Sequence, residues 1–439
     1  MTHLTSRILA GALLATGAAV LAPNHVHTQQ PALTLGDLHR RAGQHDPRAA
    51  QAALNERATE LREAVIAAER LPSVLLNASG QYQSHVARIP FAPPGGGTAP
   101  DPHHDIYDAH VAVRQPLLDP LRPARERVER GRLAEAQSGL DVALYPLRQA
   151  VDEAFFAALR LHAQRNELDA AIAGLESHLA AARVRVEQGV SLQGEVASLQ
   201  AELLGRRQSM DELAVAERNA LAALSSLTGQ SAGSASMLVL PELHATVQSL
   251  HSLTDSVRQR PEYAHYRSRR GLLADRRSVI SARDRPSVAA FGRAGYGRPG
   301  LNPLAQRFDS YWLAGVQVQW SPWSWGSTDR ERAELEVQRQ VLDTEEAAFT
   351  ERVTREADAA YATIGRLLRT LASDEEIIAL RERILSEARA QYREGVITSA
   401  TFIDRENEAL RARIARAVHR VELEQACARY LTILGVEVE

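Results

Sequence analysis

The sequence contains no lysine, so all 51 of its basic residues are arginines. This absence excludes P-loop nucleotide sites and Schiff-base chemistry, because both depend on a lysine amine. Only one cysteine is present, Cys427, so no disulfide can form within one chain and no site can be built from paired cysteines. Cys427 falls in a helical pattern near the C-terminus, where we expect a buried structural thiol.

An excess of charge of one sign is also missing. The 51 basic residues face 54 acidic ones, which leaves a net charge of −3 and no electrostatic basis for binding nucleic acid. The Gly-x-x-x-x-Gly-Lys and His-Glu-x-x-His signatures are absent. Asp101, His103, His104 and Asp105 gather in one loop, but such a cluster without a fixed scaffold is more typical of a solvated loop than of a metal site. We therefore predict no catalytic residue, no cofactor and no bound metal.

Long apolar runs are scarce as well. The one candidate, Ile8–Ala22, follows Arg7 and is too short to span a bilayer, which takes about 20 residues. A positive charge followed by a short apolar run is typical of a signal peptide, which we place at residues 1–30. Because Pro23 follows Ala22, the cleavage site stays open. An exported chain without a membrane-spanning helix is either soluble in the periplasm or inserted as strands.

Matched residues recur along the chain at two constant spacings. Two pairs lie 214 residues apart, Pro47 with Pro261 and Pro72 with Pro286, and two lie 206 apart, Pro116 with Pro322 and Gly189 with Gly395. The change in spacing falls where the first copy carries Pro93–Gly97, which has the composition of a loop. Constant spacing on both sides of one loop difference indicates a structural duplication.

Each half of the chain is predicted to hold one helix, two strands and two long helices. The first repeat, residues 31–228, has a helix at 35–71, strands at 72–84 and 106–115, and helices at 120–188 and 192–227. A linker of little regular structure, 229–246, leads to the second repeat at 247–439, which has a helix at 247–285, strands at 287–298 and 310–320, and helices at 327–394 and 399–434. Leucine or alanine recurs every seven residues from Leu133 to Ala182, which is the spacing of a coiled coil.

Three of the four strand segments alternate apolar and polar side chains over the length of a membrane strand. The fourth, Val288–Arg298, shows a weaker pattern, because it contains Arg293 and has little aliphatic content. All four tryptophans, Trp312, Trp320, Trp323 and Trp325, lie in or just after the last strand. An aromatic girdle at a membrane surface explains this clustering. The alternation alone is equally compatible with an amphipathic hairpin packed on a protein core.

Four membrane strands cannot close a barrel, since the smallest known barrels have about eight. An open sheet in lipid leaves edge amides unpaired, at a cost of several kcal/mol for each group. Other copies of the chain must therefore complete the sheet. Three copies supply twelve strands, although counting strands does not by itself fix the number of subunits.

The order of elements, repeated behind a signal peptide, resembles the TolC family of outer membrane factors. The resemblance covers essentially the whole mature chain and is carried by Arg70–Val74, Arg285–Val288, Gln115–Asp119 and the two Gly-Val turns. It implies a homotrimer with a twelve-stranded β-barrel in outer-membrane lipid and coiled-coil helices that form an α-barrel tunnel across the periplasm. It also implies that the tunnel tip docks on a periplasmic adaptor bound to an inner-membrane pump.

The resemblance assigns roles to residues at the two helix turns. The adaptor-docking tips are Gly189, Val190, Ser191, Gly395, Val396 and Ile397. The pore constriction corresponds to Glu195, Thr401 and Asp404, with only Asp404 left where members of the family often carry two acids. Ile397 stands where some members carry an arginine that latches the closed state, so how this chain closes stays open. A solvated helix face explains Glu195 and Asp404 equally well.

The predicted function is that of a passive exit duct in a tripartite efflux system. Protein secretion of type I uses the same architecture, so the cargo, the pump class and the adaptor stay open. A periplasmic coiled-coil adaptor or scaffold is the alternative of another class. A scaffold would not need membrane-length hairpins or clustered tryptophans.

Overall fold

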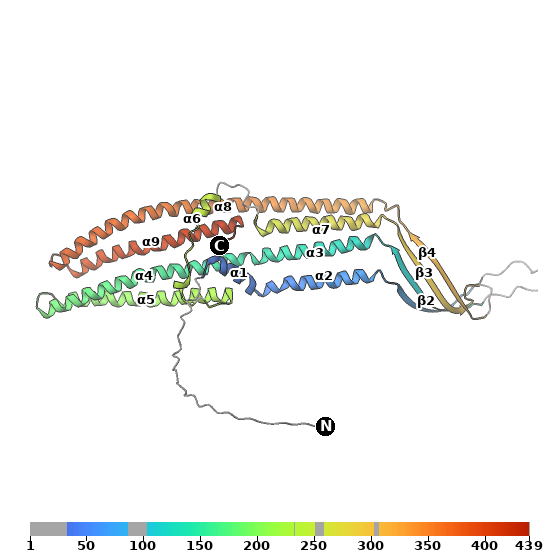
Figure 1. Cartoon of the computed structure of the whole chain (residues 1–439), viewed down its shortest axis with the longest axis horizontal. Helices are drawn as coiled ribbons and strands as arrows, with labels where there is room; N and C mark the ends of the chain where they lie inside the picture. The colour runs from blue at the N-terminus through green and yellow to red at the C-terminus, as the bar shows by residue number, and fades with distance from the viewer. Residues whose placement is uncertain (1–32, 87–102, 232, 251–258, 303–306, 439) are drawn as a thin grey trace, which may run out of the picture.

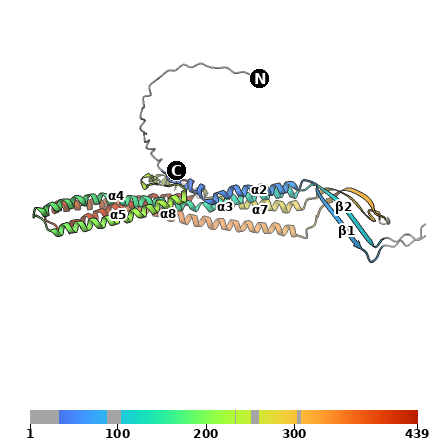
Figure 2. The same cartoon turned by 90° about the horizontal axis from the view of Figure 1, so that it is seen from below.

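The computed structural model describes residues 33–86, 103–231, 233–250, 259–302 and 307–438. The predicted signal peptide, residues 1–30, lies outside this part of the chain. The molecule is long and narrow, with a β-sheet at one end and two helical hairpins at the other (Figures 1 and 2). The prediction of a mainly helical chain with four strands is confirmed.

The first repeat begins with α1 (Leu35–His45), a short 3-10 helix η1 (Pro47–Ala50) and α2 (Gln51–Ala68), where one helix over 35–71 was predicted. The interruption lies at Asp46, whose carboxylate accepts a hydrogen bond from the backbone N–H of Arg48 at 2.8 Å. Pro47 has no N–H and cannot extend the hydrogen-bond ladder of α1. The chain therefore restarts at this point with a new cap.

The hairpin strands β1 (Ser73–Tyr82) and β2 (Asp105–Leu118) follow, and then α3 (Leu121–Leu144), α4 (Pro146–Glu187) and α5 (Gln193–Thr228). The helix predicted over 120–188 is thus divided at Tyr145, because Pro146 lacks the N–H that would continue the ladder. The residue 206 positions later is Arg352, which does have this N–H. In the second repeat the equivalent helix is unbroken.

The second repeat consists of α6 (His244–Leu250), α7 (Pro261–Arg283), β3 (Ser287–Arg298), β4 (Asp309–Gln319), α8 (Ser327–Arg393) and α9 (Ser399–Leu434). The single helix predicted over 247–285 is corrected to α6 and α7. Pro261 is the first residue of α7, where its missing N–H costs nothing, because that position has no helical acceptor.

The linker predicted over 229–246 has more structure than expected. It contains the short 3-10 helix η2 (Ala235–Met237), and Leu238 forms a parallel bridge with Leu33. The backbone N–H of Leu33 donates to Met237 O at 3.0 Å, and that of Val239 donates to Leu33 O at 3.2 Å. The linker is therefore held against the start of the first repeat.

All four strands join in one antiparallel sheet with the order β1-β2-β3-β4, so the second hairpin extends the first. Below the sheet α3 packs on α7, and farther along α4 packs on α9, which joins the two repeats along the length of the molecule. The main core lies midway, where α1, α4, α8 and α9 meet around Phe155, Phe156 and Leu431, all fully buried. This core fixes the sheet and the helix turns at opposite ends of one body.

Candidate functional site

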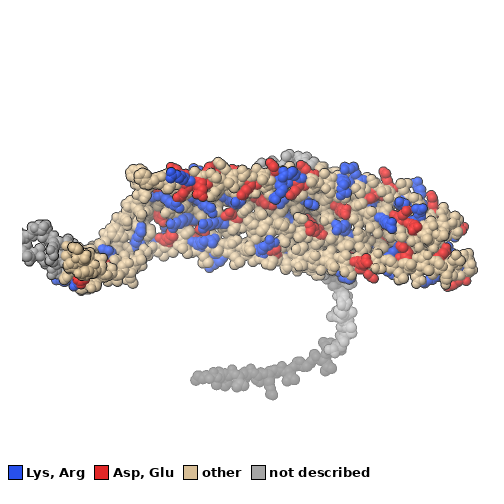
Figure 3. All heavy atoms as spheres, turned by 180° about the vertical axis from the view of Figure 1, so that it is seen from behind, with Lys and Arg blue, Asp and Glu red and all other residues tan. Residues whose placement is uncertain are grey.

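The sheet has one apolar face that runs across all four strands. The strand register places Leu76 beside Val111, Val111 beside Ala294, and Ala294 beside Trp312. Leu76 and Trp312 are 82% and 77% exposed, so this face has no cover within the chain. In Figure 3 charged side chains are spread over the helical body, whereas the sheet end carries few of them on the face shown. A surface of this kind is suited to contact with an apolar phase.

The tryptophans lie at both ends of β4 and beyond it. Trp312 and Trp320 belong to the apolar face and are eight residues apart, which is about 27 Å along a strand. The indole N–H of Trp320 donates to Asp284 O at 3.0 Å, which ties this ring to the end of the helix before β3. Trp323 and Trp325 are almost fully exposed in the segment between β4 and α8. Strands of membrane barrels are tilted by about 35–45°, so this spacing corresponds to a height of roughly 20 Å, somewhat less than the apolar band of about 25 Å.

The opposite face of the sheet carries a connected polar row. His110 Nδ1 lies 2.6 Å from Asp108 Oδ2, and the Tyr311 hydroxyl donates to the other oxygen of Asp108. Asn77 Nδ2 lies 3.3 Å from His110 Nε2, and the Arg293 guanidinium lies over the Tyr311 ring, 5.5 Å from its centroid. The row spans all four strands. Arg293, which makes β3 look weak as a strand in the sequence, is accommodated because it joins this row.

At the other end of the molecule, glycines form the turns between the long helices. Gly189 and Gly395 have φ angles of 75° and 71°, a left-handed conformation that ends α4 and α8. Val190 and Val396 are 74% and 71% exposed at the two tips. Ile397, in contrast, packs partly against the apolar cluster of the second hairpin. Of the predicted docking residues, the two valines are therefore the most available to a partner.

The predicted constriction residues lie in two separate surroundings. Glu195 is in the first turn of α5 and accepts a hydrogen bond from the Ser191 hydroxyl. Thr401 and Asp404 are exposed on α9 and line a small polar cavity of about 240 Å³ together with Arg411. Within the described ranges, Asp404 makes no ion pair, so its carboxylate is free to act on ions in solution.

The structure also links the two hairpins near their tips, which the sequence did not predict. The Arg185 guanidinium on α4 lies over the Tyr392 ring on α8 at 4.7 Å, and Tyr392 stacks on Phe402 of α9 with the ring centroids 4.9 Å apart. Burial, with a further contribution from the nearby Glu195 carboxylate, raises the pKa of Tyr392. His178 of α4 meets the edge of Phe402, and burial lowers the pKa of this histidine. The cluster of Arg185, His178, Tyr392 and Phe402 thus joins helices that lie about 200 residues apart in the sequence.

None of the helices in the described ranges is both long and apolar enough to cross a membrane. Over the same residues, no three histidine, cysteine, aspartate or glutamate side chains lie close enough together to hold a metal ion. Asp101 lies outside these residues, so the loop cluster predicted from the sequence is only partly described.

No family model and no curated protein matches the sequence. The fold, however, is similar to solved structures. The outer membrane protein VceC of Vibrio cholerae is 17% identical, with 92% of this chain and 97% of that chain covered and a TM-score of 0.62. The outer-membrane channel OprN is 18% identical, with 91% of this chain and 89% of that chain covered and a TM-score of 0.63. CusC, whose structures concern transmembrane channel formation, is 15% identical, with 92% of each chain covered and a TM-score of 0.64. The chain therefore has the fold of these outer membrane channels.

Proposed function

We propose that this chain is a channel-tunnel subunit of the TolC type, which forms a homotrimer in the outer membrane. The helices form a tunnel in the periplasm, and the exposed tips dock on a periplasmic adaptor of an inner-membrane pump. The chain acts as a passive, non-enzymatic exit duct in efflux, and the pump supplies the free energy.

The sheet carries this proposal. It has an uncovered apolar face, a polar face, and outer edges of β1 and β4 that pair with no other strand of the described chain. In hydrocarbon an unpaired backbone group costs several kcal/mol, so the two edges need neighbours. Three copies joined β1 to β4 give twelve strands, with the apolar faces toward lipid and the polar rows toward a water-filled lumen.

At the opposite end, three copies of Asp404 would form an acidic ring in the narrow part of the tunnel. A ring of carboxylates in a confined pore attracts cations, because low-dielectric walls focus the potential. Glu195, held by Ser191, is a second acid in the same region. Thr401 contributes a neutral hydroxyl where a second acid would otherwise strengthen the ring.

Two alternatives share some of these features. An outer-membrane channel for type I secretion has the same architecture and differs only in its cargo. A periplasmic adaptor or scaffold is disfavoured by the sheet, because a water-soluble protein would leave side chains such as Leu76 and Trp312 in water across a continuous apolar face.

Cross-linking between subunits tests the proposal. In a Cys427→Ser background, Ala78→Cys on β1 is combined in turn with Trp312→Cys, Ala314→Cys and Val316→Cys on β4, so that the three pairs sample three registers between subunits. We expect at least one pair to give covalent trimers in the outer-membrane fraction, and the purified trimer to conduct ions in planar bilayers. Each single-cysteine variant is the control. A monomer that stays in solution without detergent would overturn the proposal.

A further inference from the structure

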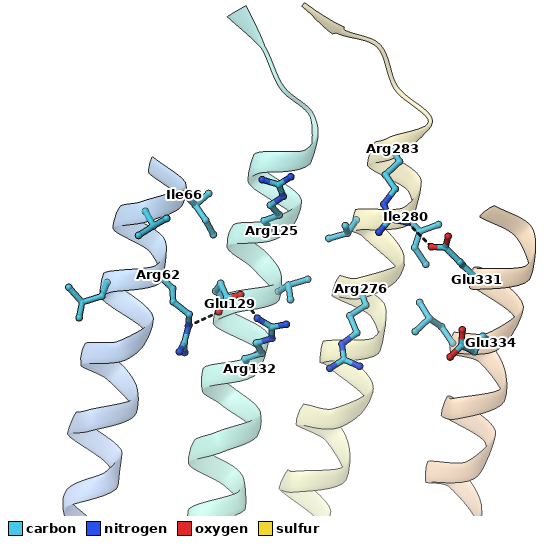
Figure 4. Close-up of a pocket in the computed structure, with 15 residues that line it drawn as sticks. Arg62, Ile66, Arg125, Glu129, Arg132, Arg276, Ile280, Arg283, Glu331 and Glu334 are labelled. Atoms are coloured by element: carbon cyan, nitrogen blue, oxygen red, sulfur yellow. Dashed lines mark hydrogen bonds and ion pairs between the residues drawn. The ribbon is translucent and has the colours of Figure 1, made fainter. Parts of the chain in front are cut away.

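Directly below the sheet, the four helices α2, α3, α7 and α8 lie side by side and line an open cavity of about 730 Å³ (Figure 4). This volume lies within the usual range of small-molecule sites. Its apolar lining includes the buried side chains of Ile66, Val128 and Ile280, which come from three of the four helices. The cavity is therefore built across the boundary between the two repeats, away from both the helix turns and the strands.

Basic side chains outnumber acidic ones around this cavity, with five arginines against three glutamates. These lining residues are Arg62, Arg125, Arg132, Arg276, Arg283, Glu129, Glu331 and Glu334. Because Glu69 pairs with Arg125 from outside the lining, the local excess is one positive charge. A positive charge next to an apolar surface favours a ligand that is both anionic and apolar.

Most of the arginines already have a partner. Glu129 is held between Arg62, at 2.7 Å, and Arg132, at 2.5 Å. Arg283 pairs with Glu331 at 2.8 Å, and Arg125 pairs outside the cavity with Glu69. These pairs occupy four of the five arginines. Among the residues that the structure describes, Glu334 is a lining acid that makes no ion pair.

Arg276 on α7 is the exception. Of the lining arginines, it is the one with no ion pair among the residues that the structure describes, and Figure 4 draws it without a contact to its neighbours. A second cavity of about 290 Å³ also includes Arg276 and is lined by Leu272, Leu273 and Val341. Arg276 therefore lines both cavities, and in the second one Glu135 and Arg269 accompany the apolar side chains.

We propose that these two cavities, which share Arg276, bind an amphipathic anion, with its phosphate or carboxylate head on Arg276 and its apolar body along α7. A guanidinium binds such heads through two parallel hydrogen bonds, while the arginine stems extend the apolar wall. The ligand is either a lipid with an anionic headgroup or a free amphipathic solute. This site is independent of the proposed transport function, because binding is measured without transport.

Native mass spectrometry of the full-length protein in a neutral detergent tests the site. The probes are dioctanoyl phosphatidylglycerol, its zwitterionic phosphatidylcholine analogue, decanoate and inorganic phosphate. We expect an anionic amphiphile to bind once per chain, and inorganic phosphate and phosphatidylcholine to bind at least about tenfold more weakly. Binding of phosphatidylglycerol alone identifies a lipid site, and binding of decanoate alone identifies a solute site. Binding of both phosphatidylglycerol and decanoate shows that an anionic head and an apolar body are sufficient for binding.

Two variants locate the bound molecule. Arg276→Ala removes the unpaired cation, and Val65→Glu places a carboxylate at an exposed position of the apolar wall, where folding is not disturbed. Both should raise the Kd of the anionic amphiphile about tenfold or more. The matched control is Arg277→Ala, because Arg277 follows on the same helix and lines neither cavity. Equal affinities for all variants, or no binding of any amphiphile, would overturn the proposal.

Discussion

Arg206 on α5 and Glu406 on α9 form an ion pair between the two repeats, with Nη2 3.1 Å from Oε2 and both side chains only 4% exposed. The same guanidinium donates to Ala171 O on α4 and to Asn407 Oδ1, each at 3.0 Å. One side chain therefore joins three helices between the core and the tips. Buried charges of this kind add little net stability, but removing one partner leaves the other uncompensated.

Arg206→Met should lower the free energy of unfolding by about 3–5 kcal/mol, because Glu406 loses its buried partner. The double variant Arg206→Met/Glu406→Leu should recover most of this loss. The matched control is Arg207→Met, since Arg207 pairs with Glu176 at the surface and such pairs contribute about 0–1 kcal/mol. Helix unfolding followed by circular dichroism in denaturant provides the measurement, and equal losses for Arg206→Met and Arg207→Met would contradict the buried pair.

Gly395 and Gly435 provide a comparison of two left-handed glycines. A Cβ at Gly395 would meet no atom within 4 Å, so Gly395→Ala should cost only the backbone strain, about 1–2 kcal/mol. A Cβ at Gly435 would lie 2.6 Å from the backbone nitrogen of Arg260, so Gly435→Ala should cost about 1–3 kcal/mol more. Thermal unfolding of the two variants and of the unmodified protein shows which variant loses more stability. A larger loss for Gly395→Ala than for Gly435→Ala would disprove the packing around Gly435.

Cys427 should be unreactive in the folded protein. Burial, with the nearby Glu424 carboxylate, raises the pKa of this thiol to about 12, so almost no thiolate is present at pH 8. We expect iodoacetamide to label Cys427 only after denaturation. Val396→Cys in a Cys427→Ser background places a thiol on the exposed tip and should react at once. Equal labelling rates for the two thiols in the folded protein would show that Cys427 is accessible.

The helices and strands follow local patterns, and the sequence predicts them well. Period-two alternation marks β1, β2 and β4, and the faces it predicts are those that the strand register brings together. Gly189 and Gly395 mark the turns, because a glycine adopts a positive φ without strain. Pro146 is also a local signal for the division between α3 and α4, but the heptad repeat continues across it and predicts one helix.

Contacts between distant segments could not be predicted in this way. Nothing near Leu238 indicates that it pairs with Leu33, and nothing near Tyr392 indicates that Arg185 covers its ring. Arg293 looks unsuited to a membrane strand until Tyr311 lies beside it. In each case the stabilising partner comes from another part of the chain, so neither local propensity nor periodicity contains the information.

Asp404→Asn should lower the ratio of cation to anion permeability of single channels in planar bilayers, since the neutral amide removes the proposed acidic ring. Asp329→Asn, in the first turn of α8 near the sheet, removes the same charge far from the tips and should leave the ratio unchanged. An unchanged ratio for Asp404→Asn would remove this residue from the pore.

Trp312 and Trp320 should lie at the two membrane surfaces. In variants that keep one tryptophan and replace the other three by phenylalanine, brominated lipids should quench the fluorescence more strongly with bromine near the headgroup than near the chain end. A variant with all four replaced and Phe349→Trp in the helical body should not be quenched, because Phe349 is buried between α7 and α8. Equal quenching by both lipids would place the rings elsewhere.

The proline that divides the first long helix has no counterpart in the second, and this gives the subunit two unlike arms. α8 is a continuous rod of 67 residues, about 100 Å, with no interruption between the tip at Gly395 and the left-handed pair Trp325 and Gly326 beside the sheet. A single ladder of backbone hydrogen bonds therefore connects that tip to the sheet. In the first arm, Pro146 removes one backbone hydrogen bond, while Tyr145 before it keeps helical φ and ψ angles of −56° and −40°. The subunit thus has one arm with an uninterrupted hydrogen-bond ladder and one arm whose ladder lacks a single bond.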